Sequence, residues 1–237
     1  AVDGTWNSLR PGMERLGARV DLEHGYIHAS LSPGGRLKGE EITFKISSVG
    51  ATANVMMAAV LAKGRTVLHN AAREPDVVAL ANGLVRMGAK IQGIGSNLLH
   101  IDGVNELGGT EHRLLPDMIE IGSFIGMAAM TRSEITIKDT GYDHLGIIPD
   151  VFRKLGIAVE RRGDDIHIPA QEHYTIEPFL DGSNRVISDH PWPGFTPDLL
   201  SIVLVTATQA RGHVLIHQKM FESRLFFVDK LIEMGAQ

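Results

Sequence analysis

The chain has 237 residues, of which 22% are charged and 43% hydrophobic, with a net charge of −5 and no cysteine. A chain of this length can bury a core without disulfides or zinc, and the lack of cysteine excludes disulfides, thiolate metal sites and a cysteine nucleophile within these residues. The negative charge argues against a nucleic-acid or anionic-membrane partner, and no apolar run reaches the ~18 residues of a membrane span, so we expect a cytoplasmic α/β protein.

An apolar stretch that ends in Lys or Arg, followed by a small residue and a β-rich run, occurs three times. The three stretches are residues 50–63, 119–132 and 198–211. They are apolar almost all round, which predicts buried helices rather than amphipathic surface helices. The small residue that follows each stretch is the expected left-handed C-cap of its helix. These residues are Gly64, Ser133 and Gly212.

A second pattern, a helix that ends in Leu/Met-Gly-Ala/Ile, alternates with the first. Its glycines are Gly17, Gly88, Gly156 and Gly235. The first three are followed by hairpin patterns whose turns contain His-Gly, Gly-Ser-Asn and Gly-Asp-Asp. The two patterns together predict a repeating unit of helix–strand–helix–strand–strand, about 70 residues long.

The register of this repeat predicts an incomplete fold. The chain opens in the second helix of one unit and stops where a hairpin would follow, so we expect a segment of a longer protein. The third unit is about ten residues longer before its buried helix than the units before it. The extra length falls in residues 181–197, and such a long loop is a common place for functional residues.

The starts of the predicted buried helices carry the first candidate residues. Ser47, Ser48 and Gly50 resemble a phosphate cradle, because free N–H groups at a helix start attract anions. Simple N-capping by Ser48 explains the same residues. Asp198 follows a loop stiffened by three prolines, and it can act either as a base in proton transfer or as a partner of the helix dipole.

Two strand–helix junctions carry the same charges. Arg224 can bind a phosphate or carboxylate, or it can pair with Glu222. Arg73 and Glu74 occupy the equivalent junction of the first full unit, and a structural ion pair explains both cases as well as a functional role does. Histidines are spread without ligand spacing, so we expect no metal site.

Five segments in order along the chain resemble the enolpyruvyl transferases, and two of them look particularly like members from Bacteroidetes. The segments are SSVGATANVMMAAVLAKG, NAAREPDVV, LLPDMIEIGSFIGMAAMTRS, PWPGFTPDL and HQKMFESRLFFVDKL. The resemblance implies an inside-out α/β barrel fold of two domains, each built from three βαβαββ units, with substrates in the cleft between them. Residues 1–115 would hold one partial and one full repeat of the first domain, and residues 116–237 one full and one truncated repeat of the second.

The resemblance also implies a reaction: transfer of enolpyruvyl from phosphoenolpyruvate to the 3-hydroxyl of UDP-N-acetylglucosamine, which is the first committed step of peptidoglycan synthesis. It implies no cofactor, and it leaves the oligomeric state open. Asp198 matches the residue assigned as base. The substrate-binding residues implied are Ile46, Ser47, Ser48, Val49, Gly50, Glu74, Met220, Glu222 and Arg224.

Some features of the family have no match in the chain. The mobile loop that carries a cysteine or an aspartate for proton transfer would lie upstream of residue 1, so we expect the chain alone to be inactive. Ile46 stands where some members have a lysine, so the phosphate charge has to be met by another group. Two alternatives remain: a transferase that uses shikimate 3-phosphate, and a non-catalytic binding or assembly module of the same fold.

Overall fold

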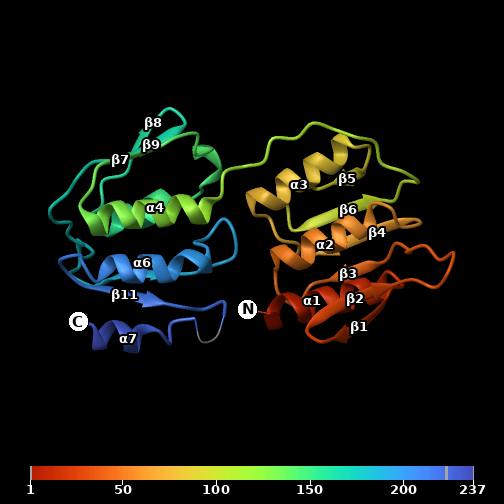
Figure 1. Cartoon of the computed structure of the whole chain (residues 1–237), viewed down its shortest axis with the longest axis horizontal. Helices are drawn as coiled ribbons and strands as arrows, with labels where there is room; N and C mark the ends of the chain where they lie inside the picture. Colours follow the sequence, from red (N-terminus) through yellow and green to blue (C-terminus); the bar gives the residue numbers. More distant parts are fainter. Residues whose placement is uncertain (1, 222–223, 237) are drawn as a thin grey trace. The chain divides into compact units, whose positions relative to one another are not determined.

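The computed structural model describes residues 2–221 and 224–236, with side chains from residue 7 onward. The chain divides into two compact units, Ala1–Leu115 and Pro116–Gln237 (Figure 1). Each unit has its own hydrophobic core. Their assignment to the two domains of the family remains a proposal. Within the described residues, no helix is both long and apolar enough to cross a membrane.

Unit 1 combines three helices with a two-stranded and a four-stranded sheet. Its elements are α1 (Val2–Arg15), β1 (Arg19–Glu23), β2 (Tyr26–Ser30), β3 (Glu41–Thr43), α2 (Val49–Ala59), β4 (Arg65–His69), α3 (Pro75–Arg86), β5 (Lys90–Gln92) and β6 (Leu98–Asp102). The larger sheet has the order β3-β4-β6-β5, in which only β3 and β4 are parallel. Helix α2 packs against both α1 and α3, and its buried face closes the core over this sheet.

Unit 2 repeats much of this arrangement. Its elements are α4 (Met118–Thr131), β7 (Ile135–Ile137), the 3₁₀ turn η1 (Tyr142–His144), α5 (Ile148–Lys154), β8 (Glu160–Arg162), β9 (Asp165–Ile168), β10 (Arg185–Ser188), the 3₁₀ turn η2 (Pro197–Leu199), α6 (Leu200–Ala207), β11 (Val214–His217) and α7 (Val228–Glu233). One sheet has the antiparallel order β7-β9-β8, and the other is the parallel pair β10-β11. The core lies between these strands and α4, α5 and α6.

The predicted repeat is confirmed. The order α2–β4–α3–β5–β6 recurs as α4–β7–α5–β8–β9, and α6–β11–α7 begins a third copy. The predicted hairpins form as β1–β2, β5–β6 and β8–β9. In the first of them, His24 and Gly25 both have positive φ, of 49° and 83°. This is the backbone twist that a two-residue hairpin turn requires.

Three expectations need correction. The extra segment 181–197 contains β10, which occupies the place of β3 in the earlier repeat, so it is not a loop throughout. Arg132, not Ser133, is the left-handed C-cap of α4, with φ 55°, and α2 already ends at Ala59, well before Gly64. The apolar helices are not buried on all sides, because α4 exposes a strip that includes Phe124 and Met127.

Glycine allows α4 to pack closely on the start of α6. A Cβ added at Gly122 would lie 2.6 Å from both methyl carbons of the fully buried Leu199. We expect Gly122→Ala to lower the free energy of unfolding by about 1–3 kcal/mol, because the core has no room for the methyl group. Chemical denaturation measures this change. Gly109→Ala, where an added Cβ meets nothing within 4 Å and φ is not positive, is the control. Equal losses in the two variants would contradict the packing argument.

Candidate active site

The candidate residues of unit 1 follow the carboxyl ends of two parallel strands. Strands β3 and β4 pair in parallel, with Thr43 opposite His69. The segments after them, 44–50 and 70–74, therefore leave the sheet at one edge. The hydroxyl of Thr52 in α2 accepts a hydrogen bond from the backbone N–H of Ala72 at 2.9 Å, and this bond joins the two segments. In open α/β sheets, ligands bind at this edge.

Ser48 caps α2, as one of the two sequence interpretations predicts. Its side chain accepts a hydrogen bond from the N–H of Ala51 at 3.3 Å, and α2 has no acidic residue in its first turn. The start of the helix therefore keeps a partial positive charge that no neighbouring carboxylate of that turn cancels. Ile46, just before it, is 46% exposed and adds apolar surface but no charge. Capping and anion binding are compatible here.

Glu74 lies at the N-cap position of α3, but its side chain makes no capping bond. Its carboxylate instead accepts the backbone N–H of Arg73 at 2.9 Å. Burial raises the pKa of Glu74 above its ordinary value of 4.5, although this hydrogen bond favours the charged form. Perturbed carboxylates of this kind are common at functional sites.

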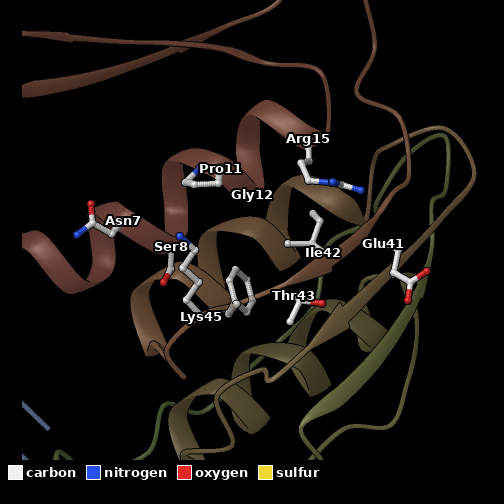
Figure 2. Close-up of a pocket in the computed structure, with 10 residues that line it drawn as sticks. Asn7, Ser8, Pro11, Gly12, Arg15, Glu41, Ile42, Thr43 and Lys45 are labelled. Carbon is white, nitrogen blue, oxygen red and sulfur yellow. The ribbon is translucent and has the colours of Figure 1, made fainter.

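A cavity of about 390 Å³ opens in unit 1 between α1 and the end of β3. Its lining includes Ser8, Arg15, Glu41 and Lys45, and Figure 2 shows the Lys45 side chain extending from the end of β3 toward Ser8. Ser8 is only 5% exposed, and its hydroxyl has no hydrogen-bond partner. Arg15 pairs with Glu40 and Glu41 with His69. Among the described residues no carboxylate pairs with Lys45. Sequence reasoning missed this lysine, although it adjoins Ile46.

The candidate residues of unit 2 occupy the equivalent edge. Strands β10 and β11 pair in parallel, with Ser188 opposite His217, so the segments that begin at residues 189 and 218 leave the sheet at the same edge. Asp198 lies in η2, directly before α6. The two units thus place their candidate residues after the same pair of strands in the repeat.

Asp198 and Arg224 meet directly. The Nη1 atom of Arg224 lies 2.5 Å from Oδ1 of Asp198, and the guanidinium carbon lies 4.8 Å from the centroid of the Phe221 ring. The side chain of Asp198 is 53% exposed and that of Arg224 is 31% exposed, so both groups remain accessible to a ligand. Arg224 therefore pairs with Asp198, which the sequence did not predict. Glu222, the partner considered from the sequence, lies outside the described residues.

The backbone of Met220 is held by a hydrogen bond to a buried carboxylate. Its N–H donates to Oδ2 of Asp189 at 3.1 Å, and the N–H of Lys219 donates to Oδ1 of the same carboxylate at 2.6 Å. Asp189 is completely buried. Sequence reasoning missed Asp189, although the residue lies in the extra segment that was singled out for its length.

The sequence matches a protein-family model over residues 7–237, and the description of that model is EPSP synthase (3-phosphoshikimate 1-carboxyvinyltransferase). The chain belongs to the EPSP synthase family. This membership confirms the resemblance to enolpyruvyl transferases seen in the sequence.

Two curated relatives have high identity to the chain. UDP-N-acetylglucosamine 1-carboxyvinyltransferase from Bacteroides thetaiotaomicron is 63% identical over 95% of the chain, and the enzyme of the same name from Porphyromonas gingivalis is 61% identical over 95%. The chain spans about half the length of these relatives, 52% in each case.

Two solved structures of other proteins support the fold. The enolpyruvyl transferase NikO from Streptomyces tendae matches with a TM-score of 0.77 at 19% identity, over 96% of this chain and 55% of that one. An EPSP synthase from Acinetobacter baumannii matches with a TM-score of 0.58 at 17% identity, over 89% of this chain and 47% of that one. At these identities the likeness shows the fold alone.

The raised pKa of Glu74 makes stability depend on pH. The folded state binds this proton more tightly than the unfolded state, so the contribution is complete below about pH 4.5 and is lost as the pH rises through the folded pKa. Glu74→Gln stays neutral and keeps an acceptor for Arg73. We therefore expect its stability relative to the wild type to increase as the pH rises from about 4.5 through the folded pKa of Glu74. Urea unfolding at a series of pH values measures this, and the exposed Glu111→Gln controls for the loss of one charge. The same change of stability with pH in both variants would contradict the raised pKa of Glu74.

Proposed function

We propose that this chain forms about half of an enzyme that transfers enolpyruvyl from phosphoenolpyruvate to the 3-hydroxyl of UDP-N-acetylglucosamine and releases phosphate. The observation that carries the proposal is the Asp198–Arg224 pair at the strand edge of unit 2, in a chain 63% identical to a relative named for this reaction. By this reaction the protein would act in the cytoplasm, at the first committed step of peptidoglycan synthesis.

Asp198 is the proposed base. It takes the proton of the sugar hydroxyl as the hydroxyl oxygen bonds to the central carbon of phosphoenolpyruvate, whose methylene carbon gains a proton from another group. The tetrahedral adduct then loses phosphate and a methyl proton, which restores the double bond. Arg224 lies beside Asp198 and can hold the carboxylate in position or bind an anionic group of the adduct.

Unit 1 is the proposed site for the nucleotide. Ser47, Ser48, Val49 and Gly50 form the start of α2, where free backbone N–H groups and the helix dipole favour an anion such as a diphosphate. Ile46 supplies no charge there, whereas the neighbouring Lys45 is a cation with no carboxylate paired to it among the described residues. We assign the missing positive charge to Lys45. Glu74 lies at the same edge of the sheet.

A second candidate substrate is shikimate 3-phosphate, which the description of the matching family model favours. The relatives at 61–63% identity are named for the nucleotide sugar instead. Calorimetric titration of the whole protein with each compound separates the two. We expect binding of UDP-N-acetylglucosamine alone, and binding of neither compound would favour a non-catalytic module of the same fold.

Asp198→Asn tests the base. We expect the variant of the whole protein to lose turnover by about 100-fold or more, because general base catalysis contributes on that scale, while it binds UDP-N-acetylglucosamine nearly as the wild type does. Steady-state kinetics and calorimetry measure the two properties. Asp150→Asn removes another exposed aspartate that pairs with an arginine in unit 2, Arg153 at 2.6 Å, and serves as control. Near-normal turnover of Asp198→Asn would remove Asp198 as the base.

Lys45→Ala tests the source of the phosphate charge. We expect the dissociation constant for UDP-N-acetylglucosamine to rise about tenfold, and its dependence on salt to weaken, because one cation near the diphosphate is gone. Calorimetry at low and high salt measures both effects. The exposed Lys63→Ala is the control for the loss of one lysine from unit 1. Equal affinities of the two variants would assign the charge to another group.

A further inference from the structure

Asp189 is a buried charge in an unusual setting. It is the first residue after β10 and is 0% exposed, and no cation of the described chain forms an ion pair with it. A carboxylate removed from water costs free energy unless hydrogen bonds replace its solvation. Its two oxygens receive these bonds from successive backbone N–H groups, those of Lys219 and Met220. The carboxylate therefore fixes the backbone that follows β11.

The fold itself does not require a carboxylate at this place. The register Thr43–His69 in unit 1 corresponds to Ser188–His217 in unit 2, so Asp189 takes the place of Phe44. Phe44 is apolar and buried. Two repeats of one fold thus fill the same position with a hydrophobic ring and with a charge.

The N–H groups that Asp189 binds have other partners in the first repeat. There the equivalent groups belong to Ala71 and Ala72, and they donate to the carbonyl of Asn97 and the hydroxyl of Thr52. In the aligned stretches 50–63 and 198–211, Leu200 takes the place of Thr52, and its side chain cannot accept a hydrogen bond. The third repeat has replaced a neutral acceptor on the helix by a buried charge on the adjacent strand end.

The turn that Asp189 holds leads directly to the candidate site. Gln218 fixes its far side, because its amide nitrogen donates to the carbonyl of Phe221 and its amide oxygen accepts the N–H of Arg224 at 3.2 Å. Arg224 then reaches Asp198. Gln218 thus holds the part of the turn next to Arg224, and Asp189 holds the part at Met220.

We propose that Asp189 is a positioning residue for substrate binding, which fixes the backbone of Met220 against the nucleotide sugar. The proposal rests on the proposed function and on the resemblance to the enolpyruvyl transferases, which implies that Met220 contacts the nucleotide sugar through its backbone. Because Asp189 takes the N–H of Met220, the carbonyl is the backbone group of Met220 that is left to bind the ligand. A carbonyl accepts hydrogen bonds, so its partner is a donor: a hydroxyl or the amide N–H of an N-acetylated sugar.

Asp189→Asn tests the proposal in the whole protein. It keeps the size of the side chain but turns one acceptor into a donor that faces a backbone N–H. We expect the KM for UDP-N-acetylglucosamine to rise about tenfold with kcat lowered less than threefold, because the contact is made equally in the bound substrate and in the transition state. Hydrogen exchange at the amides of residues 219 and 220 should also become faster, whether or not substrate is present.

Asp164→Asn, which changes an exposed carboxylate with a similar bonding pattern, is the control. Its carboxylate also accepts two successive backbone N–H groups in unit 2, those of Gly141 at 3.3 Å and Tyr142 at 2.9 Å, away from the candidate residues in sequence. We expect faster exchange at residues 141 and 142 with no change in KM. An equal rise in KM in both variants would overturn the proposal, because it would reflect general loosening of the unit.

The remaining outcomes distinguish a failure of the role assigned to Asp189 from a failure of the proposed function. Faster exchange at residues 219 and 220 with an unchanged KM would make Asp189 purely structural and overturn the inference, while the proposed function would stand. Failure of the wild-type protein to bind or turn over UDP-N-acetylglucosamine would overturn both. If Asp189→Asn does not fold, Asp189→Glu keeps the charge but displaces it by one methylene group, and the same rise in KM is expected of it.

Discussion

The parallel pairing of β3 with β4 and of β10 with β11 is the constraint on which the candidate site depends. The other described strand pairs are antiparallel. A parallel pair brings the ends of two segments, well separated in sequence, to one edge of a sheet, and the residues just past that edge become neighbours. Asp198 and Arg224, 26 residues apart, meet in this way, and so do the start of α2 and the segment before α3.

The same framework position carries different chemistry in the two units. In unit 1 the helix after the parallel strand starts with Ser48 as its cap and no acidic residue in its first turn, which favours an anion. In unit 2 the corresponding start carries Asp198, the residue proposed as the base. Repetition of one backbone lets the chain vary the side chains at the strand edge without altering the core beneath them, since Ile42 and Ile187, at equivalent positions of β3 and β10, are both buried.

Much of this fold could be predicted from the sequence, because the signals are local. The His24–Gly25 turn and the glycines after the helices specify hairpins and helix ends within a few residues. Strands β3 and β10 were not predicted from the local patterns, because neither directly follows a predicted helix or belongs to a predicted hairpin. What defines β10 as a strand is its pairing with β11, and a partner about 30 residues away leaves no local pattern.

The candidate site, too, could be predicted from the sequence only where its residues interact with near neighbours in the chain. Ser48 was recognisable as a cap, since a cap is a relation between neighbours. The partner of Arg224 was not, because Asp198 and Glu222 are equally suitable carboxylates in sequence and only the strand edge brings Asp198 within 2.5 Å. Asp189 was the hardest to find, because its role is defined by backbone N–H groups, which every residue except proline carries.

The first repeat shows whether the fold itself requires the buried carboxylate of Asp189. A buried carboxylate held by backbone donors has two explanations: the fold needs an acceptor there, or the local geometry serves a ligand. The first repeat separates them, because it builds the same edge with Phe44 and satisfies the equivalent N–H groups with neutral acceptors. Since a neutral solution exists in the same chain, the cost of burying the charge of Asp189 is not imposed by the fold. The carboxylate of Asp189 holds the turn that carries Met220. We therefore expect the effect that offsets this cost to lie in the conformation of that turn.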